Sequence, residues 1–417
     1  MDRLEINIAI MGCISSGKST FLNSIFVEQY SDMTIKRNTM VPQVYKESIN
    51  NFKKEKEILK ENKIINEKYQ VEKDVKFKKE DCVEILHNVP KIRYFVPLPQ
   101  EVYFTFYDIP GLNDSTTKDI YYQWFDENCH KFDIIIYMID INSAMNTSDE
   151  IDLLNRIKKN ILKLKEDKIK DIHLVALVNK CDDLVFTKKK SNLSNRYGFF
   201  TLNDDELEEM YTQILKIFDN TLKESGIKYE VLPISAIDMY IYKHLKLKPN
   251  IGLDIKLLNK IGENEFGKRI WKKKSISEKR EKLKNHFKNN NNYADAIKNS
   301  GHTNMTNIFK EILFMQNQFN IFNKKLKHYL NSPNIINYIN INHAIIINDC
   351  NLEELLNIYT TNNLLIVKII KTYNINIYSL LIDVIKHHIL ELLNKYFIFE
   401  NSSEEHIKNL ENYKSII

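Results

Sequence analysis

A short segment near the N-terminus, MGCISSGKST, constrains the fold more than any other part of the chain. It fits the pattern G-x-x-x-x-G-K-S, with Gly12, Gly17, Lys18 and Ser19 at the fixed positions. Glycines let the backbone turn so that successive N–H groups surround a phosphate chain, lysine supplies positive charge, and the serine hydroxyl can bind Mg²⁺. An apolar run precedes the segment and an amphipathic stretch follows it, which places the loop at a helix N-terminus, where anions are favoured.

A chance glycine turn is the alternative, but the chain has only nine glycines and two of them lie here. We therefore predict a phosphate-binding loop. The residues expected to contact phosphate or cation are Gly12, Ser15, Ser16, Gly17, Lys18, Ser19 and Thr20.

Three further motifs follow apolar, strand-like segments. They are Asp108-Ile109-Pro110-Gly111, Asn179-Lys180-Cys181-Asp182 and Ser235-Ala236. Strands and helices alternate up to about residue 240, and each motif stands at the C-terminal end of a strand, which is the ligand-binding edge of an open parallel sheet. We therefore predict an α/β fold in which helices flank a mainly parallel central sheet, followed by a smaller all-α region.

Each motif has a chemical role in such a site. Asp108 at a strand end can hold Mg²⁺ through water, and the Gly111 N–H can bond a γ-phosphate. Thr39 is the candidate second hydroxyl ligand of Mg²⁺ beside Ser19, with Thr34 as a competing candidate.

The N-K-C-D motif predicts the base. The Asp182 carboxylate can accept hydrogen bonds from N1–H and the 2-amino group of guanine, which adenine does not offer there, so the site should reject ATP. Asn179 is expected to tie the base loop to the phosphate loop, and the Lys180 stem to pack over the purine. Ser235-Ala236 is expected to offer an N–H to the guanine 6-oxo group. Each motif alone can be an ordinary turn, but four in this order predict a domain that binds GTP and GDP.

Composition and charge indicate the cellular location and the kinds of partner to expect. The chain has 417 residues and a net charge of +5, and its five cysteines are scattered without zinc-ligand spacing. We expect a reducing, cytoplasmic location, with no transmembrane segment because charged residues interrupt the longest apolar runs. The mixed Lys and Glu of the insertion at about residues 50–82 indicate a solvent-exposed helical segment or a partly disordered one. The basic segments 268–274 and 278–288 are also more typical of solvated faces, so nucleic acid is not the expected partner.

The order of strand-like and helix-like segments predicts the domain organisation. We predict a nucleotide-binding domain over residues 1–330 and a helical region over 331–417. Within the first, KIRYF at 91–95 and EVYFTFYD at 101–108 resemble the two strands of a hairpin. A helix cap is expected at Asn203, and a long amphipathic helix at 305–330.

These motifs resemble those of the dynamin superfamily of large GTPases. The phosphate loop, Thr39-Met40-Val41-Pro42 and D-I-P-G are similar to the first three motifs of that family. The resemblance covers about residues 4–325, and its later part rests on Glu265-Phe266, His286-Phe287, Tyr293 and Gly301.

The resemblance implies a Mg²⁺-dependent GTPase, in a minimal form without a full stalk. Further implications are a homodimer formed through the GTPase domains, peripheral contact with a membrane, and a K⁺ or Na⁺ ion beside Ser15. The residues that it assigns to hydrolysis are Ser15, Lys18, Thr39 and Gly111.

Two departures bear on catalysis. Ile14 stands where animal dynamins carry a glutamine, and Leu112 stands where small signalling GTPases carry theirs. The motif N-K-C-D also differs from the usual T-K-x-D of dynamins. A switch GTPase of another class, such as an RNA- or ribosome-associated or signalling one, is therefore the main alternative, and a binding protein that hydrolyses little GTP is the third.

Overall fold

The computed structural model describes residues 4–31, 39–71, 78–92, 95–96, 102–112, 117–167, 172–195, 198–202, 204–248 and 253–313. Thr34 and the predicted helical region 331–417 lie outside these residues. So does most of the helix predicted at 305–330. The chain divides into two compact units, residues 1–310 and 311–417. Within the described ranges, no helix combines the length and apolar character needed to cross a membrane.

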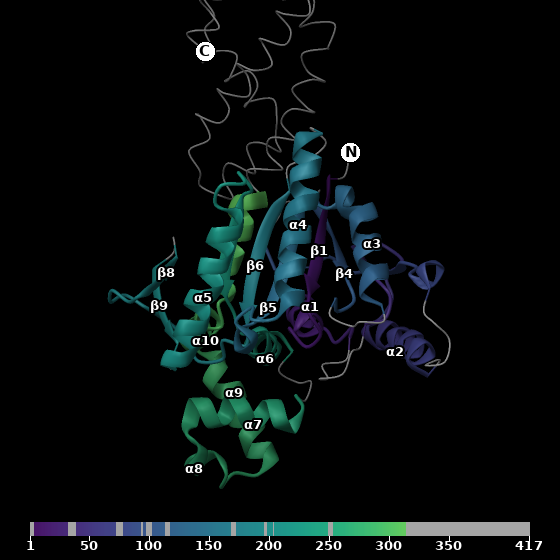
Figure 1. The fold of residues 1–417 in the computed structure, drawn as a ribbon. Coiled ribbons are helices and arrows are strands. Elements are labelled where there is room, and N and C mark those ends of the chain that lie inside the picture. The colour runs from purple at the N-terminus through teal and green to yellow at the C-terminus, as the bar shows by residue number, and fades with distance from the viewer. Residues whose placement is uncertain are drawn as a thin grey trace, which may run out of the picture. The chain divides into compact units, whose positions relative to one another are not determined.

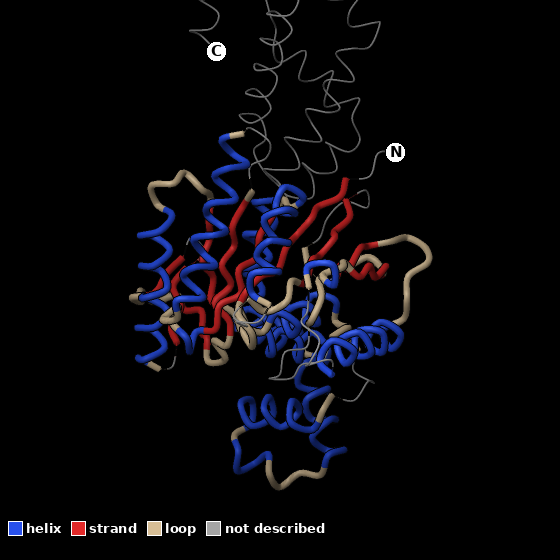
Figure 2. The backbone as a smooth tube through the Cα atoms, turned by 45° about the vertical axis from the view of Figure 1, so that its right-hand side comes forward, coloured by secondary structure: helices blue, strands red, loops and turns tan. Residues whose placement is uncertain are grey.

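A seven-stranded sheet forms the centre of the first unit (Figures 1 and 2). The strand order is β10-β6-β5-β1-β4-β2-β3, and every neighbouring pair is parallel except β2 and β4. This confirms the predicted α/β class with a mainly parallel sheet. The strands are β1 Leu4–Gly12, β2 Gln43–Glu47, β3 Ile85–Val89, β4 Val102–Asp108, β5 Ile134–Asp140, β6 His173–Asn179 and β10 Tyr229–Pro233.

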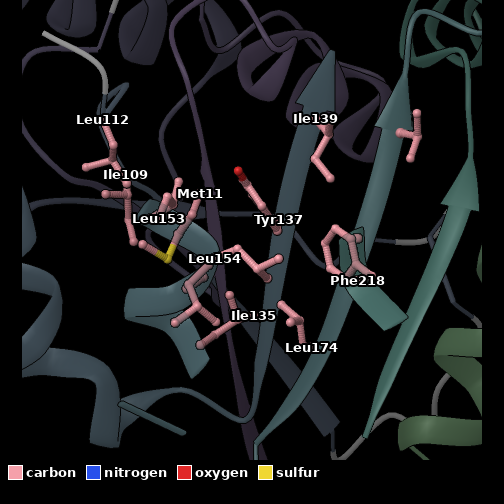
Figure 3. Close-up of a cluster of buried hydrophobic side chains, with 14 of the residues drawn as sticks. Met11, Ile109, Leu112, Ile135, Tyr137, Ile139, Leu153, Leu154, Leu174 and Phe218 are labelled. Atoms are coloured by element: carbon pink, nitrogen blue, oxygen red, sulfur yellow. The ribbon is translucent and has the colours of Figure 1, made fainter. Parts of the chain in front are cut away.

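Helices cover both faces of the sheet because its strands are apolar on both sides. Met11, Tyr137 and Leu174 point to the face covered by α3 Lys118–Asn128, α4 Ser148–Glu166 and α5 Asp205–Leu222, where the main core cluster lies (Figure 3). The opposite face carries α1 Lys18–Phe26, whose Phe26 ring lies 5.9 Å from that of Phe106. Helix α6 Ala236–Leu247 packs against α1.

Helices follow the sheet, as expected. They are α7 Ile255–Phe266, α8 Lys268–Trp271, α9 Ile276–Lys288 and α10 Asn290–Asn299, and residues 302–313 are also helical. We call α7, α8 and α9 the helical lobe. A separate apolar cluster, centred on the fully buried Trp271, joins the lobe to α6 and α10. Three 3₁₀ helices lie in the described part at Lys79–Asp81, Cys129–Lys131 and Ile141–Ser143.

Several local predictions were wrong. No strand lies in the described part of residues 91–95. Among the described residues β3 is instead the strand before β4, it pairs in parallel with β2, and the antiparallel partner of β4 is β2 rather than a strand at 91–95. A three-stranded antiparallel sheet was missed, made of β7 Leu184–Thr187, β8 Leu193–Asn195 and β9 Gly198–Leu202. The N-cap of α5 is Asp204, which accepts from the Glu206 N–H, rather than Asn203.

Candidate functional site

The phosphate-loop segment connects β1 to α1 in the predicted way. Gly12 has φ of 152° and Gly17 of 96°, which is left-handed backbone that favours glycine. A Cβ at Gly12 would lie 2.4 Å from the Met138 carbonyl oxygen, and one at Gly17 would lie 2.0 Å from Asn179 Nδ2. Both glycines are therefore required for the loop to close against its neighbours.

The Lys18 side chain is buried beside this loop. Its Nζ donates hydrogen bonds of 2.9 Å to the carbonyl oxygens of Gly12 and Cys13. The ammonium charge and the N-terminus of α1 therefore lie at the same end of the loop, which favours an anion there. Ser16 Oγ is also buried, and it has no hydrogen-bond partner among the described residues. Ser15, by contrast, is exposed and has φ of 65°.

Thr39 and Asp108 lie together at the end of β4. Thr39 Oγ1 donates to Asp108 Oδ2 at 3.2 Å, and both side chains are buried. Burial raises the pKa of Asp108 to about 6, although the nearby Lys18 charge and the Thr39 hydroxyl oppose the rise. Asp108 Oδ1 has no partner within the described ranges. A buried carboxylate with an unused oxygen fits a Mg²⁺ ion, and Ser19 lies in the first turn of α1.

The segment after β4 passes directly against the phosphate loop. A Cβ at Gly111 would lie 2.5 Å from Ile14 Cγ1 and 3.0 Å from Ile14 Cα, so only glycine fits there. Leu112 is fully buried in the main core cluster, as Figure 3 shows. Neither the Ile14 nor the Leu112 side chain has a polar group that could orient a water molecule.

Asn179 at the end of β6 joins three loops. Its Nδ2 donates to the Ser16 carbonyl oxygen at 2.9 Å, and its Oδ1 accepts from the Ala236 N–H at 2.9 Å. The phosphate loop, the N-K-C-D segment and the turn after β10 therefore form one continuous site.

Asp182 lies on the outer side of that junction. Its Oδ1 accepts from Ser235 Oγ at 2.7 Å, and its Oδ2 lies 2.9 Å from Lys260 Nζ. Lys180 has φ of 68°, and its ammonium forms an ion pair with Asp140 at the end of β5. The sequence analysis missed Asp140, although its place at the end of a buried strand was a usable signal.

Helix α2, Glu55–Val71, lies within the predicted charged insertion, but one side of it is buried. Asn62 Nδ2 donates to the Tyr30 carbonyl oxygen at 2.9 Å, and Asn66 Oδ1 accepts from the Met40 N–H at 3.0 Å. Tyr121 OH, from α3, donates to the Met40 carbonyl oxygen at 2.6 Å. The residue that follows Thr39 is thus held from two sides by residues that no motif indicated.

The inner side of α2 continues into a buried polar network. His87 Nε2 lies 2.9 Å from Asn62 Oδ1 and 2.8 Å from Gln43 Oε1, and Asn62 Nδ2 also donates to Tyr45 OH at 3.1 Å. Burial lowers the pKa of His87 to about 4, so the imidazole is neutral at physiological pH. The network therefore fixes α2 to β2 and β3 without a buried charge on the histidine.

Comparison with known proteins finds similarity to one family over part of the chain. Residues 8–165 match the model of the dynamin family. An uncharacterized protein of Acanthamoeba polyphaga mimivirus is 23% identical over 279 residues, which are 65% of this chain and 42% of that protein. The chain thus spans less than half the length of this relative.

Solved structures with similar folds were also found. One is a bacterial dynamin of an oligomerised pair described as sensing and tethering membranes, at 16% identity over 99% of this chain and 54% of that chain, with a TM-score of 0.36. Another is Era from Aquifex aeolicus bound to GDP and AlF₄⁻, at 18% identity over 56% of this chain and 52% of that chain, with a TM-score of 0.30.

Proposed function

Since residues 8–165 of this chain match the dynamin family, we propose that the protein binds guanine nucleotides and hydrolyses GTP to GDP and phosphate. The observation that carries the proposal is the pair of hydrogen bonds made by Asn179. They join the loop that would hold phosphates to the turn that would hold a base. One nucleotide can therefore contact both.

The proposed roles follow from the chemistry at each position. Lys18 and the amides of the phosphate loop neutralise the phosphate charge, and the Gly111 N–H meets the γ-phosphate. Asp182 accepts from the guanine N1–H and 2-amino group, while adenine offers this carboxylate no donor at those positions. Ser19 and Thr39 would hold Mg²⁺ with Asp108 behind them, and the ion would supply positive charge for the β- and γ-phosphates.

A competition experiment tests base choice. A fluorescent GDP analogue is bound to the full-length chain and displaced with GTP, GDP or ATP, and phosphate release from GTP is measured in parallel. We expect GTP and GDP to compete at least 100-fold better than ATP, because a site built around a base donor rejects the analogue that lacks it. Lys18→Ala should abolish tight binding. If ATP competed as well as GTP, the assignment of Asp182 would be wrong.

We also propose that the chain acts as a dimer at a membrane, as its resemblance to dynamins suggests. Co-sedimentation with anionic liposomes and with RNA, each in GTP, GDP and no nucleotide, compares this proposal with that of an RNA-associated switch. GTP-dependent pelleting with liposomes alone supports the membrane proposal, and pelleting with RNA alone favours the switch.

A further inference from the structure

Lys260 of α7 contacts two carboxylates from different parts of the candidate site. Its Nζ lies 2.9 Å from Asp182 Oδ2 and 3.0 Å from Asp238 Oδ1. We propose that Lys260 is a positioning residue for base selection, which holds the Asp182 carboxylate in the orientation that guanine requires. This inference rests on the proposed guanine-nucleotide function and adds a residue to it from outside the sequence motifs.

The exposure of the three side chains shows which one is the anchor. Asp238 is 5% exposed, Lys260 28% and Asp182 40%. Asp238 lies in the first turn of α6, where its N–H donates to Ser235 Oγ at 3.3 Å. The buried Asp238 therefore fixes the ammonium, and the ammonium in turn fixes the more exposed Asp182.

Both oxygens of Asp182 keep capacity for a base. Each carboxylate oxygen has two lone pairs, and Ser235 Oγ and Lys260 Nζ each use one oxygen. One position on each oxygen is left for the N1–H and the 2-amino group of guanine. An exposed aspartate without these partners would lose rotational freedom on binding, and pre-orientation reduces that loss.

The helical lobe fixes Lys260 itself. Trp271 packs so closely on α7 that a Cβ at Gly262 would lie 2.0 Å from its ring. Trp271 Nε1 also donates to Asn259 Oδ1 at 3.0 Å, one residue before Lys260. The packing of the lobe thus fixes the α7 backbone at Lys260, while Asp238 fixes its ammonium, and these helices thereby take part in the proposed base recognition.

The test compares GDP with IDP, whose base lacks the 2-amino group, in full-length Lys260→Met. We expect the affinity for GDP to fall about tenfold, and that for IDP to fall less, because GDP makes two hydrogen bonds to Asp182 and IDP makes one. The ratio of GDP to IDP affinity should therefore fall. Lys260→Arg should restore it, and Lys256→Met, at an exposed position one turn earlier on α7, should leave it unchanged.

A second variant separates positioning from folding. Lys260→Met leaves two neighbouring carboxylates without the lysine cation between them, so the double variant Lys260→Met/Asp238→Asn removes the buried charge as well. We expect it to fold with near-wild-type thermal stability and still show the reduced ratio. If the ratio of GDP to IDP affinity in the folded double variant equalled that of the wild type, whether or not both affinities fell, the proposal would be overturned. Failure of the proposed function itself would be evident in the wild type, which would then bind neither nucleotide.

Discussion

Individual side chains in this site each contact two partners from different parts of the chain. Asp182 makes its two contacts through different oxygens, and the amide of Asn179 uses both of its ends to join separate loops. Such groups are sensitive to the exchange of a single atom, because a buried donor or acceptor left without a partner is costly. The predictions for single residues therefore use substitutions that keep the size and shape of the side chain.

Asp182→Asn should change base preference. The amide presents a donor where the carboxylate presented an acceptor, so it repels the 2-amino group of guanine and suits the 2-oxo group of xanthine. We expect affinity for GDP to fall by about two orders of magnitude and xanthosine diphosphate to become the better ligand. Titration of both diphosphates into wild type and variant measures this. Retained preference of the variant for GDP would contradict the assignment.

Asp238 should make stability depend on pH. Burial raises its pKa from an ordinary 3.8 to about 6, although Lys260 and Ser235 oppose the rise and Asp182 adds to it. The folded state therefore keeps a proton that the unfolded state releases, so this contribution to stability is complete below about pH 4 and is lost as the pH rises through about 6. It amounts to about 3 kcal/mol.

Urea unfolding between pH 4 and pH 7.5 checks the sign. Asp238→Asn cannot ionise, so its free energy of unfolding should gain on that of the wild type as the pH rises across this range. Parallel curves for the two proteins would show that Asp238 has an ordinary pKa in the folded state.

At the scale of secondary structure, helix α2 has a buried face that the pattern of charges in its sequence does not reveal. Helix α2 has an exposed charged side, and its opposite side carries Ile58 and Asn62, which are buried. These two residues and Asn66 are spaced by four positions, so they share one face of the helix. Because two of the three are asparagines, hydrophobic periodicity does not detect this face, yet it binds backbone groups on both sides of residues 32–38.

Asn66→Ala should slow hydrolysis more than it weakens binding. The Met40 N–H would lose its partner, and Thr39, its neighbour, would be held less well for the Mg²⁺ shell that it is proposed to join in the triphosphate state. We expect kcat for GTP to fall about fivefold, from one lost hydrogen bond, with little change in GDP affinity. Lys60→Ala, on the exposed side of α2, is the matched control.

Single-turnover hydrolysis and GDP titration give both quantities. Thr39→Ala should reduce hydrolysis further than Asn66→Ala. If Asn66→Ala hydrolysed GTP at the wild-type rate while Thr39→Ala was inactive, α2 would have no part in positioning Thr39.

At the scale of the whole molecule, the phosphate loop and the loop after β4 lack a side chain that could orient water for the proposed hydrolysis. Ile14 packs against Gly111 and Leu112 lies in the core, so neither side chain can orient a water molecule in the proposed reaction. The exposed Ser15 in left-handed backbone remains accessible at the loop surface. These features are consistent with a site completed by a second GTPase domain and a monovalent cation, as proposed from the resemblance to dynamins.

Turnover per molecule should therefore rise with protein concentration, require K⁺ or Na⁺, and be lost in Ser15→Ala. The reason is that the charge developing near the β/γ bridge needs a further cation. Phosphate release across a 100-fold range of concentration, with light scattering in GDP and in a transition-state mimic, measures both effects. Flat specific activity with a monomer in every nucleotide state would favour an ordinary switch or a weakly hydrolysing binding protein.

Some sequence expectations failed where local patterns were ambiguous. Residues 91–95 are rich in β-forming side chains, but no strand lies in their described part. The edge strand β3 has an exposed Leu86 and a buried polar His87, so it lacks the usual alternation of buried apolar and exposed polar residues. The small sheet of β7, β8 and β9 was missed because its strands are three to five residues long. Short strands depend on their partners, which local sequence does not identify.

The sequence by itself determined the α/β class and the positions of the nucleotide motifs. Each motif is a run of adjacent residues whose chemistry is complete within one loop, and parallel strands bring the ends of such loops to one edge. Only the tertiary structure decided which residues support those loops. Lys260 reaches Asp182 across 78 positions, and Asn66 reaches Met40 across 26. Such contacts arise from packing between distant elements, and no spacing in the chain encodes them.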